Sequence, residues 1–223
     1  QDATDFLSED TKQFYVEHGL PYVRTYLLYG SPGNGKTSCI KTLASELKLN
    51  LYSLNMASSK LDDNGLVDMV HSVLKRSIVA MEDVDRIFNN FTHNETASSV
   101  SFSTMINLLD GILSKDGVIF VLTCNHKDQL DAALRRCGRI HREFEFKDAS
   151  PKVAEDLFLS YYPQATEAAK KFAKKIKDRP NVPVASLQEF FLKNRKRTAT
   201  EAAGNQLDES MFESRRKLDL VTM

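Results

Sequence analysis

A glycine-rich segment between an apolar strand and a helix constrains this chain more than any other feature. Residues 30–37 read GSPGNGKT and match the pattern G-x-x-x-x-G-K-[ST] without departure. The apolar run 24–29 precedes the segment and a helical pattern begins at about residue 36, which is the context that gives the motif meaning. Loops of this kind hold phosphate with backbone N–H groups at a helix N-terminus, so the segment predicts a nucleotide-phosphate site.

We assign phosphate binding to nine consecutive residues. The glycines let the backbone bend and approach a ligand closely. Lys36 would reach the β- and γ-phosphates, and the hydroxyl of Thr37 would bind Mg²⁺. The complete set is Gly30, Ser31, Pro32, Gly33, Asn34, Gly35, Lys36, Thr37 and Ser38.

A pair of acidic residues follows the second predicted strand after the glycine-rich segment. The apolar run 77–81 leads directly into Glu82 and Asp83. As neighbours on an extended chain, the two carboxylates would point to opposite faces. One can hold a magnesium ion through water while the other polarises the attacking water, in a reaction that depends mainly on positioning and charge stabilisation.

Strands and helices alternate along the first two thirds of the chain, which is typical of βαβ units and a parallel sheet. Strands are predicted at 24–29, 50–54, 77–81, 117–122 and 141–146, and helices at about 36–48, 64–75, 99–113 and 129–135. Beyond Ser150 the pattern is helical, at 152–161, 164–177 and 184–193. The predicted domains are an α/β domain at 1–149, a helical subdomain at 150–197 and a polar tail at 198–223.

Composition excludes several classes of protein. Thirty basic and thirty acidic side chains give a net charge of zero, which excludes binding to nucleic acid or membrane through bulk charge. The longest uninterrupted apolar run, 118–122, is far shorter than the roughly 20 residues of a membrane helix. Three widely spaced cysteines lack the spacing of a metal or redox motif.

Four segments, in this order and spacing, resemble an AAA+ ATPase: GSPGNGKT, SIVAMEDVDRIF, VLTCN and ALRRCGRI. The resemblance implies a P-loop α/β fold, with a parallel sheet of order 5-1-4-3-2 and a small C-terminal helical lid. It also implies ATP and Mg²⁺ as ligands, and hydrolysis of ATP to ADP and phosphate by a homo-oligomeric ring. The family usually has Asp-Glu where this chain has Glu82-Asp83. The reversed pair is similar to the mitochondrial chaperones that assemble respiratory complex III by moving the folded Rieske iron–sulfur protein.

The resemblance also assigns roles. By position, Glu82 would bind Mg²⁺ through water, together with Thr37. Asp83 would polarise the attacking water. Asn125 matches an asparagine that contacts the γ-phosphate and this water. Arg136 and Arg139 match arginines that reach the ATP site of the neighbouring subunit, where a planar guanidinium stabilises charge on the transferring phosphoryl group.

The subfamily resemblance implies work on a protein client, by translocation or complex assembly. It places the protein at the mitochondrial inner membrane, and without it we expect a cytoplasmic protein. Contact with a membrane would come only through segments outside this chain. The stretch 55–59 (NMASS) has neither an aromatic residue nor a glycine, which argues against threading an extended peptide and favours a folded client.

Other functions remain open from the residues alone. A DNA-acting AAA+ loader or remodeller would use the tract 170–197, which holds ten basic and two acidic side chains. Aromatic residues do not interleave there as stacking platforms would require, so we favour a solvated lid and do not expect nucleic acid as a partner. A small-molecule P-loop kinase is disfavoured by RRCGR and the separate lid, and a non-hydrolysing scaffold by the intact acidic pair.

Overall fold

The apolar runs of the sequence form a five-stranded parallel sheet in a computed structural model, which describes residues 1–55, 61–85, 100–179 and 181–205. The strand order is β2-β3-β4-β1-β5, and every neighbouring pair is parallel. This confirms the predicted order 5-1-4-3-2. The strands are β1 (Val23–Tyr29), β2 (Asn50–Leu54), β3 (Ser77–Met81), β4 (Val118–Cys124) and β5 (Arg142–Glu145).

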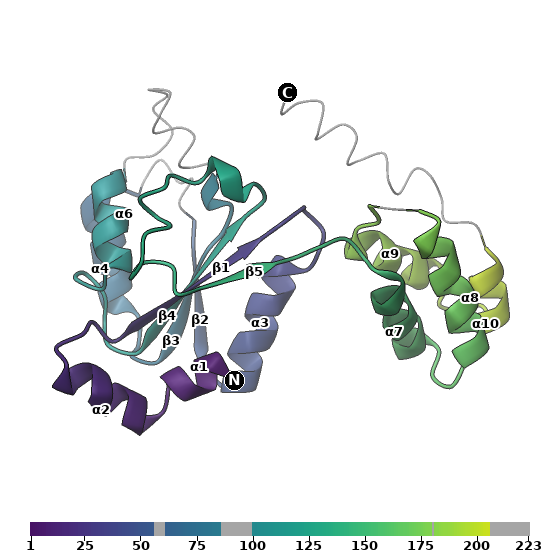
Figure 1. Cartoon of the computed structure of the whole chain (residues 1–223), viewed down its shortest axis with the longest axis horizontal. Coiled ribbons are helices and arrows are strands. Elements are labelled where there is room, and N and C mark those ends of the chain that lie inside the picture. The colour runs from purple at the N-terminus through teal and green to yellow at the C-terminus, as the bar shows by residue number, and fades with distance from the viewer. Residues whose placement is uncertain (56–60, 86–99, 180, 206–223) are drawn as a thin grey trace. The chain divides into compact units, whose positions relative to one another are not determined.

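The sheet is buried on both faces at its centre, because every residue of β3 and β4 is buried. Their side chains alternate between two cores, as the period of a strand requires. One core contains Val79 and Phe120 with residues of α4 (Asp63–Ser72) and α6 (Phe102–Leu109). The other contains Ile78 and Ile119 with residues of α1 (Asp2–Phe6) and α3 (Lys36–Leu47). Figure 1 shows these helices flanking the sheet.

Two local predictions for this part of the chain differ from the structure. Neither the short helix α1 nor the helix α2 (Glu9–Glu17) was predicted. The helix predicted at 129–135 is wrong, since the chain forms the 3₁₀ turn η1 (Lys127–Gln129) and then irregular turns. There the Asp131 carboxylate accepts the Ala133 N–H at 2.7 Å, a local hydrogen bond that competes with helix formation.

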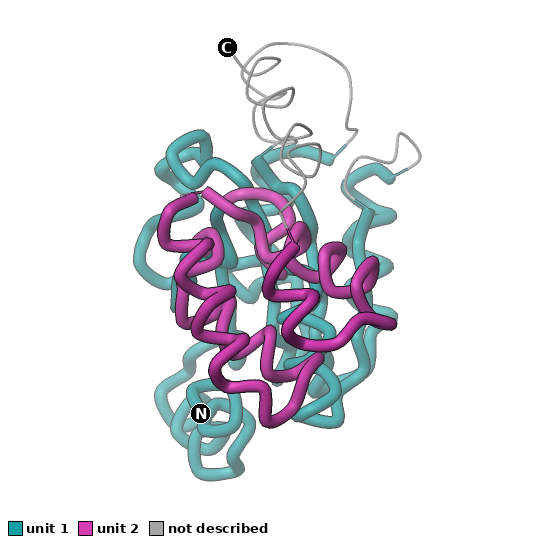
Figure 2. Tube along the Cα trace, turned by 90° about the vertical axis from the view of Figure 1, so that its right-hand side faces the viewer, with its two compact units in different colours: residues 1–30, 36–146 teal, residues 31–35, 147–223 magenta. Residues whose placement is uncertain are grey.

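The helical segments after residue 150 form a separate core. They are α7 (Pro151–Tyr161), α8 (Thr166–Lys177), α9 (Val184–Asn194) and α10 (Ala199–Gly204). Phe158, Phe172, Phe190 and Phe191 are fully buried in this core and contact one another. By compactness the chain divides into residues 1–30 with 36–146, and residues 31–35 with the chain from 147 onward (Figure 2).

Helix α10 lies in the segment that the sequence suggested to be a polar tail. Thr198 and Glu201 form a capping box at its start, which satisfies two backbone N–H groups that would otherwise lack partners. Ala202 and Ala203 are buried in the helical core. The helical unit therefore continues past residue 198 as far as α10, and residues 206–223 lie outside the described part of the chain.

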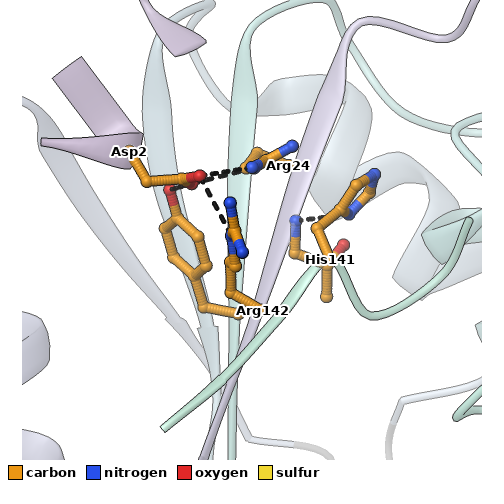
Figure 3. A network of polar contacts seen from close by, with 6 residues as sticks. Asp2, Arg24, His141 and Arg142 are labelled. Atoms are coloured by element: carbon orange, nitrogen blue, oxygen red, sulfur yellow. Dashed lines mark hydrogen bonds and ion pairs between the residues drawn. The ribbon is translucent and has the colours of Figure 1, made fainter. Parts of the chain in front are cut away.

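Asp2 holds α1 against the sheet through hydrogen bonds to two strands (Figure 3). Its carboxylate accepts from Arg24 Nε at 3.0 Å, from the Tyr26 hydroxyl at 2.7 Å and from Arg142 Nε at 3.2 Å. Burial by itself would raise the pKa of Asp2, but the hydrogen bonds from Arg24, Tyr26 and Arg142 outweigh it and lower the pKa to about 2.

We expect Asp2→Asn to lower the free energy of unfolding by about 2 kcal/mol at pH 7, because the charged acceptor is lost. The folded-state pKa of Asp2 lies below its ordinary value of 3.8. Its contribution is therefore present above pH 3.8 and is lost as the pH falls toward 2. Urea unfolding at pH 7 and pH 3 measures both effects, with the exposed Asp68→Asn on α4 as control. Equal stability of the two variants at pH 7 would refute the role of Asp2.

Candidate active site

The predicted site residues gather at one edge of the sheet because the strands are parallel. The carboxyl ends of β1, β3 and β4 lie at that edge, where open α/β sheets bind ligands. Gly30 follows β1, Glu82 follows β3 and Asn125 follows β4, while α3 begins at Lys36. Residues up to 95 positions apart in the sequence thus meet in one place.

Lys36 forms the centre of the site. Its side chain is buried, and its Nζ donates to Asn125 Oδ1 at 2.8 Å and to the Gly30 carbonyl. Burial lowers the pKa of Lys36, and the negative charges of Asp83 and Asp85 oppose that shift. The oxygen atoms of Asn125 and Gly30 therefore accept hydrogen bonds from the ammonium group that phosphate oxygens could accept in their place.

Thr37 and Glu82 form a pair of oxygen donors beside Lys36. The Thr37 hydroxyl donates to Glu82 Oε2 at 2.6 Å, and both side chains are half-buried. Within the ranges that the structure describes, no cluster of three or more His, Cys, Asp or Glu could hold a metal ion. Two neighbouring oxygens suit Mg²⁺, which is bound through few protein ligands together with water and substrate phosphates. The residues present therefore fit a magnesium site of this kind.

Asp83 has a left-handed backbone, with φ of +53°. Its N–H donates to the Thr123 hydroxyl at 3.0 Å, which fixes the turn after β3. Positive φ is uncommon for residues other than glycine and often occurs at functional sites. Both acids lie beyond the last strand residue, Met81. The expectation that they alternate as strand residues is therefore wrong, and the turn sets their directions.

Gly30 is required by a close backbone approach. Its φ is +129°, and a Cβ atom at this position would lie 2.2 Å from the carbonyl oxygen of Phe146. The approach arises because Phe146 continues the pairing of β5 with β1, donating its N–H to the Tyr29 carbonyl at 2.7 Å. Any larger residue would force the two segments apart.

The middle of the phosphate loop, residues 31–35, belongs to the helical unit. The Ala185 N–H donates to the Gly33 carbonyl at 2.9 Å. Asn34 is buried, donates to Asp148 at 2.9 Å and accepts from the Val184 N–H at 3.2 Å. The remaining loop residues of the predicted set are half-buried or exposed: Ser31, Pro32, Gly35 and Ser38.

The two predicted arginines differ sharply in their surroundings. Arg139 donates through Nε and Nη2 to the two carboxylate oxygens of Asp110, at 2.8 and 3.1 Å, and through Nη1 to the Ala133 carbonyl at 2.6 Å. These bonds to Asp110 raise the pKa of Arg139. Arg136 is exposed, and its guanidinium has no partner among the described residues. Neither arginine contacts Lys36, Thr37 or the acidic pair within the chain.

Sequence reasoning missed two acids. Asp110, at the end of α6, orders the arginine turn, and Asp85 is buried beside Asn125. No sequence pattern indicates a role for Asp110, because a single acidic residue after a helix is common. Asp85 stood in the quoted stretch EDVD, but strand alternation does not predict its burial.

A P-loop followed by an acidic pair and a polar residue after the next strand defines an ATP-hydrolysing class of protein. The family model described as ATPase family associated with various cellular activities (AAA) matches residues 26–148, more than half of the chain. The chain therefore belongs to this family. Residues 151–206 match a second model, described as Mitochondrial chaperone BCS1-like, ATPase lid domain.

Curated relatives agree with both models. The chain is 36% identical over 197 residues to the probable mitochondrial chaperone bcs1 of Schizosaccharomyces pombe, covering 87% of this chain and 43% of that protein. It is 34% identical over 201 residues to the mitochondrial chaperone BCS1 of Homo sapiens, covering 86% and 48%. An Arabidopsis thaliana AAA-ATPase, At2g18193, is 39% identical over 139 residues, covering 58% and 28%. The chain thus spans about half the length of the BCS1 relatives or less.

Two expectations concern partners of the chain, namely a client protein and a membrane. The stretch 55–59, expected to lack a threading loop, falls almost wholly on residues 56–60, which lie outside the described residues. Helices long and apolar enough to cross a membrane are absent from the described part of the chain.

Proposed function

We propose that this chain hydrolyses MgATP to drive chaperone-type protein translocation or complex assembly, as part of a homo-oligomeric ring. The observation that carries the proposal is the convergence of Lys36, Thr37, Glu82 and Asn125 at one sheet edge, joined by hydrogen bonds of 2.8 and 2.6 Å. A lysine for phosphates, an oxygen pair for a cation and an amide for the attacking water are the parts that ATP hydrolysis needs.

In this proposal each residue has one task. Lys36 leaves Asn125 and binds the β- and γ-phosphates, which frees the Asn125 amide for the γ-phosphate and the water. Thr37, together with Glu82 through water, would hold Mg²⁺, which would neutralise charge on the phosphates. Asp83 accepts a hydrogen bond from the attacking water. The held backbone of Asp83 reduces the reorganisation required at the moment of reaction.

The ring is proposed because, among the described residues, neither Arg136 nor Arg139 has a hydrogen bond or ion pair to the site of its own chain. Arg136 is exposed and unpaired among the described residues, so a neighbouring subunit can receive it. Arg139 is hydrogen-bonded to Asp110. We propose that it contributes to hydrolysis by stabilising the turn that carries Arg136. The ATPase subdomain would comprise residues 1–149 and the lid would begin at residue 150.

The client and the location rest on the named relatives. Several are mitochondrial chaperones by name, so we place this protein in mitochondria, at the inner membrane, acting on a protein client in its folded state. An ATP-driven unfolding assay on a tagged globular substrate tests the last point. Robust unfolding would refute the handling of folded clients.

The magnesium assignment predicts a difference between two substitutions of Thr37. Thr37→Ala should raise the Mg²⁺ concentration for half-maximal ATP hydrolysis by about tenfold or more, because a cation ligand is lost. Thr37→Ser keeps the hydroxyl and should stay close to the wild type. Phosphate release across a Mg²⁺ titration at fixed ATP measures both. Identical titrations for the two variants would exclude Thr37 as a ligand, and no MgATP turnover by the wild type would contradict the proposed function itself.

A further inference from the structure

Asp85 is the one buried carboxylate among the described residues. It lies four residues after the end of β3 and is 3% exposed. A carboxylate is rarely buried to this degree unless it is paired, because desolvation of the charge is costly.

Its Oδ2 atom accepts two backbone hydrogen bonds from the turn after β4. The N–H groups of Asn125 and His126 donate to it at 2.9 and 3.2 Å. The Asn125 side chain is held independently, by Lys36. Asn125 is therefore fixed at its backbone by Asp85 and at its amide by Lys36, and the two bonds can be broken separately.

The other oxygen, Oδ1, is buried and has no hydrogen-bond partner among the described residues. Leaving a buried polar atom unsatisfied is costly, and such groups in folded proteins call for an explanation. A neutral Asn could accept the same two N–H bonds, so backbone anchoring alone does not require a carboxylate. The carboxylate makes both bonds charge-assisted, and such bonds are stronger than those to a neutral amide oxygen.

We propose, on the basis of the proposed ATPase function, that Asp85 is a positioning residue for ATP hydrolysis. It holds the Asn125 backbone in place when phosphate draws Lys36 away from the Asn125 amide. The amide then turns toward the γ-phosphate and the water while its backbone stays fixed.

The test compares turnover with binding in the full chain. For Asp85→Ala we expect kcat to fall about 10- to 100-fold, as for other residues that orient a catalytic group, while the Kd of a fluorescent ATP analogue with Mg²⁺ changes less than about threefold. Asp85→Asn keeps an acceptor for the two N–H groups, so we expect an intermediate kcat. Asp128→Asn, on the exposed surface of the same turn, should match the wild type in both.

A double-mutant cycle shows whether Asp85 acts through Asn125. In an Asn125→Ala background, Asp85→Asn should cost little further activity, because the two residues belong to one unit. Unchanged kcat in Asp85→Ala would overturn the proposal. A parallel loss of kcat and nucleotide affinity with a lower Tm would also overturn it, because that combination indicates a purely structural residue. If Asp85→Ala does not fold, Asp85→Asn with wild-type kcat is the overturning result. Absence of turnover in the wild type would instead refute the ATPase proposal.

Discussion

Asp83→Asn is expected to retain MgATP binding and to lower kcat by about 100-fold or more, the usual contribution of a catalytic base. The backbone of Asp83 is fixed by the Thr123 hydroxyl, so the substitution should leave the turn intact and remove only the carboxylate. Isothermal titration with an ATP analogue and steady-state phosphate release measure the two quantities on the same preparation.

Glu82→Gln is the matched comparison, because it is the neighbouring acid and the side chain that accepts from Thr37. We expect it to raise the Mg²⁺ requirement, and to recover part of its activity at high Mg²⁺, which Asp83→Asn should not. This pattern would assign the water to Asp83 in spite of the reversed order of the pair. The opposite pattern, with an active Asp83→Asn and an inactive Glu82→Gln at any Mg²⁺ concentration, would exchange the two roles.

Arg136→Ala is expected to lower kcat by about 1,000-fold or more, the range reported for an arginine supplied to a phosphoryl-transfer site. ATP binding should largely persist, because Arg136 does not contact Lys36 or Thr37 within the chain. Arg135→Ala is the matched control, since it removes an adjacent exposed arginine. Phosphate release and analytical ultracentrifugation with MgATP show whether turnover and assembly separate.

Arg139 should behave differently from Arg136. Removing it leaves Asp110 without its bidentate partner, so Arg139→Ala should lower Tm as well as kcat, and Asp110→Asn should reproduce much of that loss. Full activity of Arg136→Ala, or of a dilute monomer of the wild type, would contradict a trans-acting arginine.

The sheet could be predicted because its determinants are local. The apolar runs of β3 and β4 are nearly continuous, as strands buried on both faces require, and Gly117, with a positive φ, directly precedes β4. The phosphate loop could be predicted for a similar reason, since Gly30, Lys36 and Thr37 stand at fixed spacing along one segment.

The remaining features depend on contacts between distant residues. Helix α1 is only five residues long and is held by Asp2 to Arg24 and Arg142, a contact that no periodicity reveals. The helix predicted at 129–135 fails for a local reason instead, because the Asp131 carboxylate accepts the Ala133 N–H, which the apolar pattern does not reveal. Asp85 stands next to the recognised acidic pair, yet only the fold shows that it meets the turn at Asn125.

The most direct test of the central claim is a mixture of two inactive variants. Each site is proposed to need Asp83 from one subunit and Arg136 from its neighbour, so Asp83→Asn and Arg136→Ala lack different halves. After equal mixing, with subunit exchange verified by differently labelled chains, about a quarter of the interfaces should contain both halves, as a repeated head-to-tail contact requires. If Arg136 acts in the neighbouring site, phosphate release returns to about that fraction of the wild-type rate. Exchange of subunits without any recovery would exclude such a trans-acting arginine.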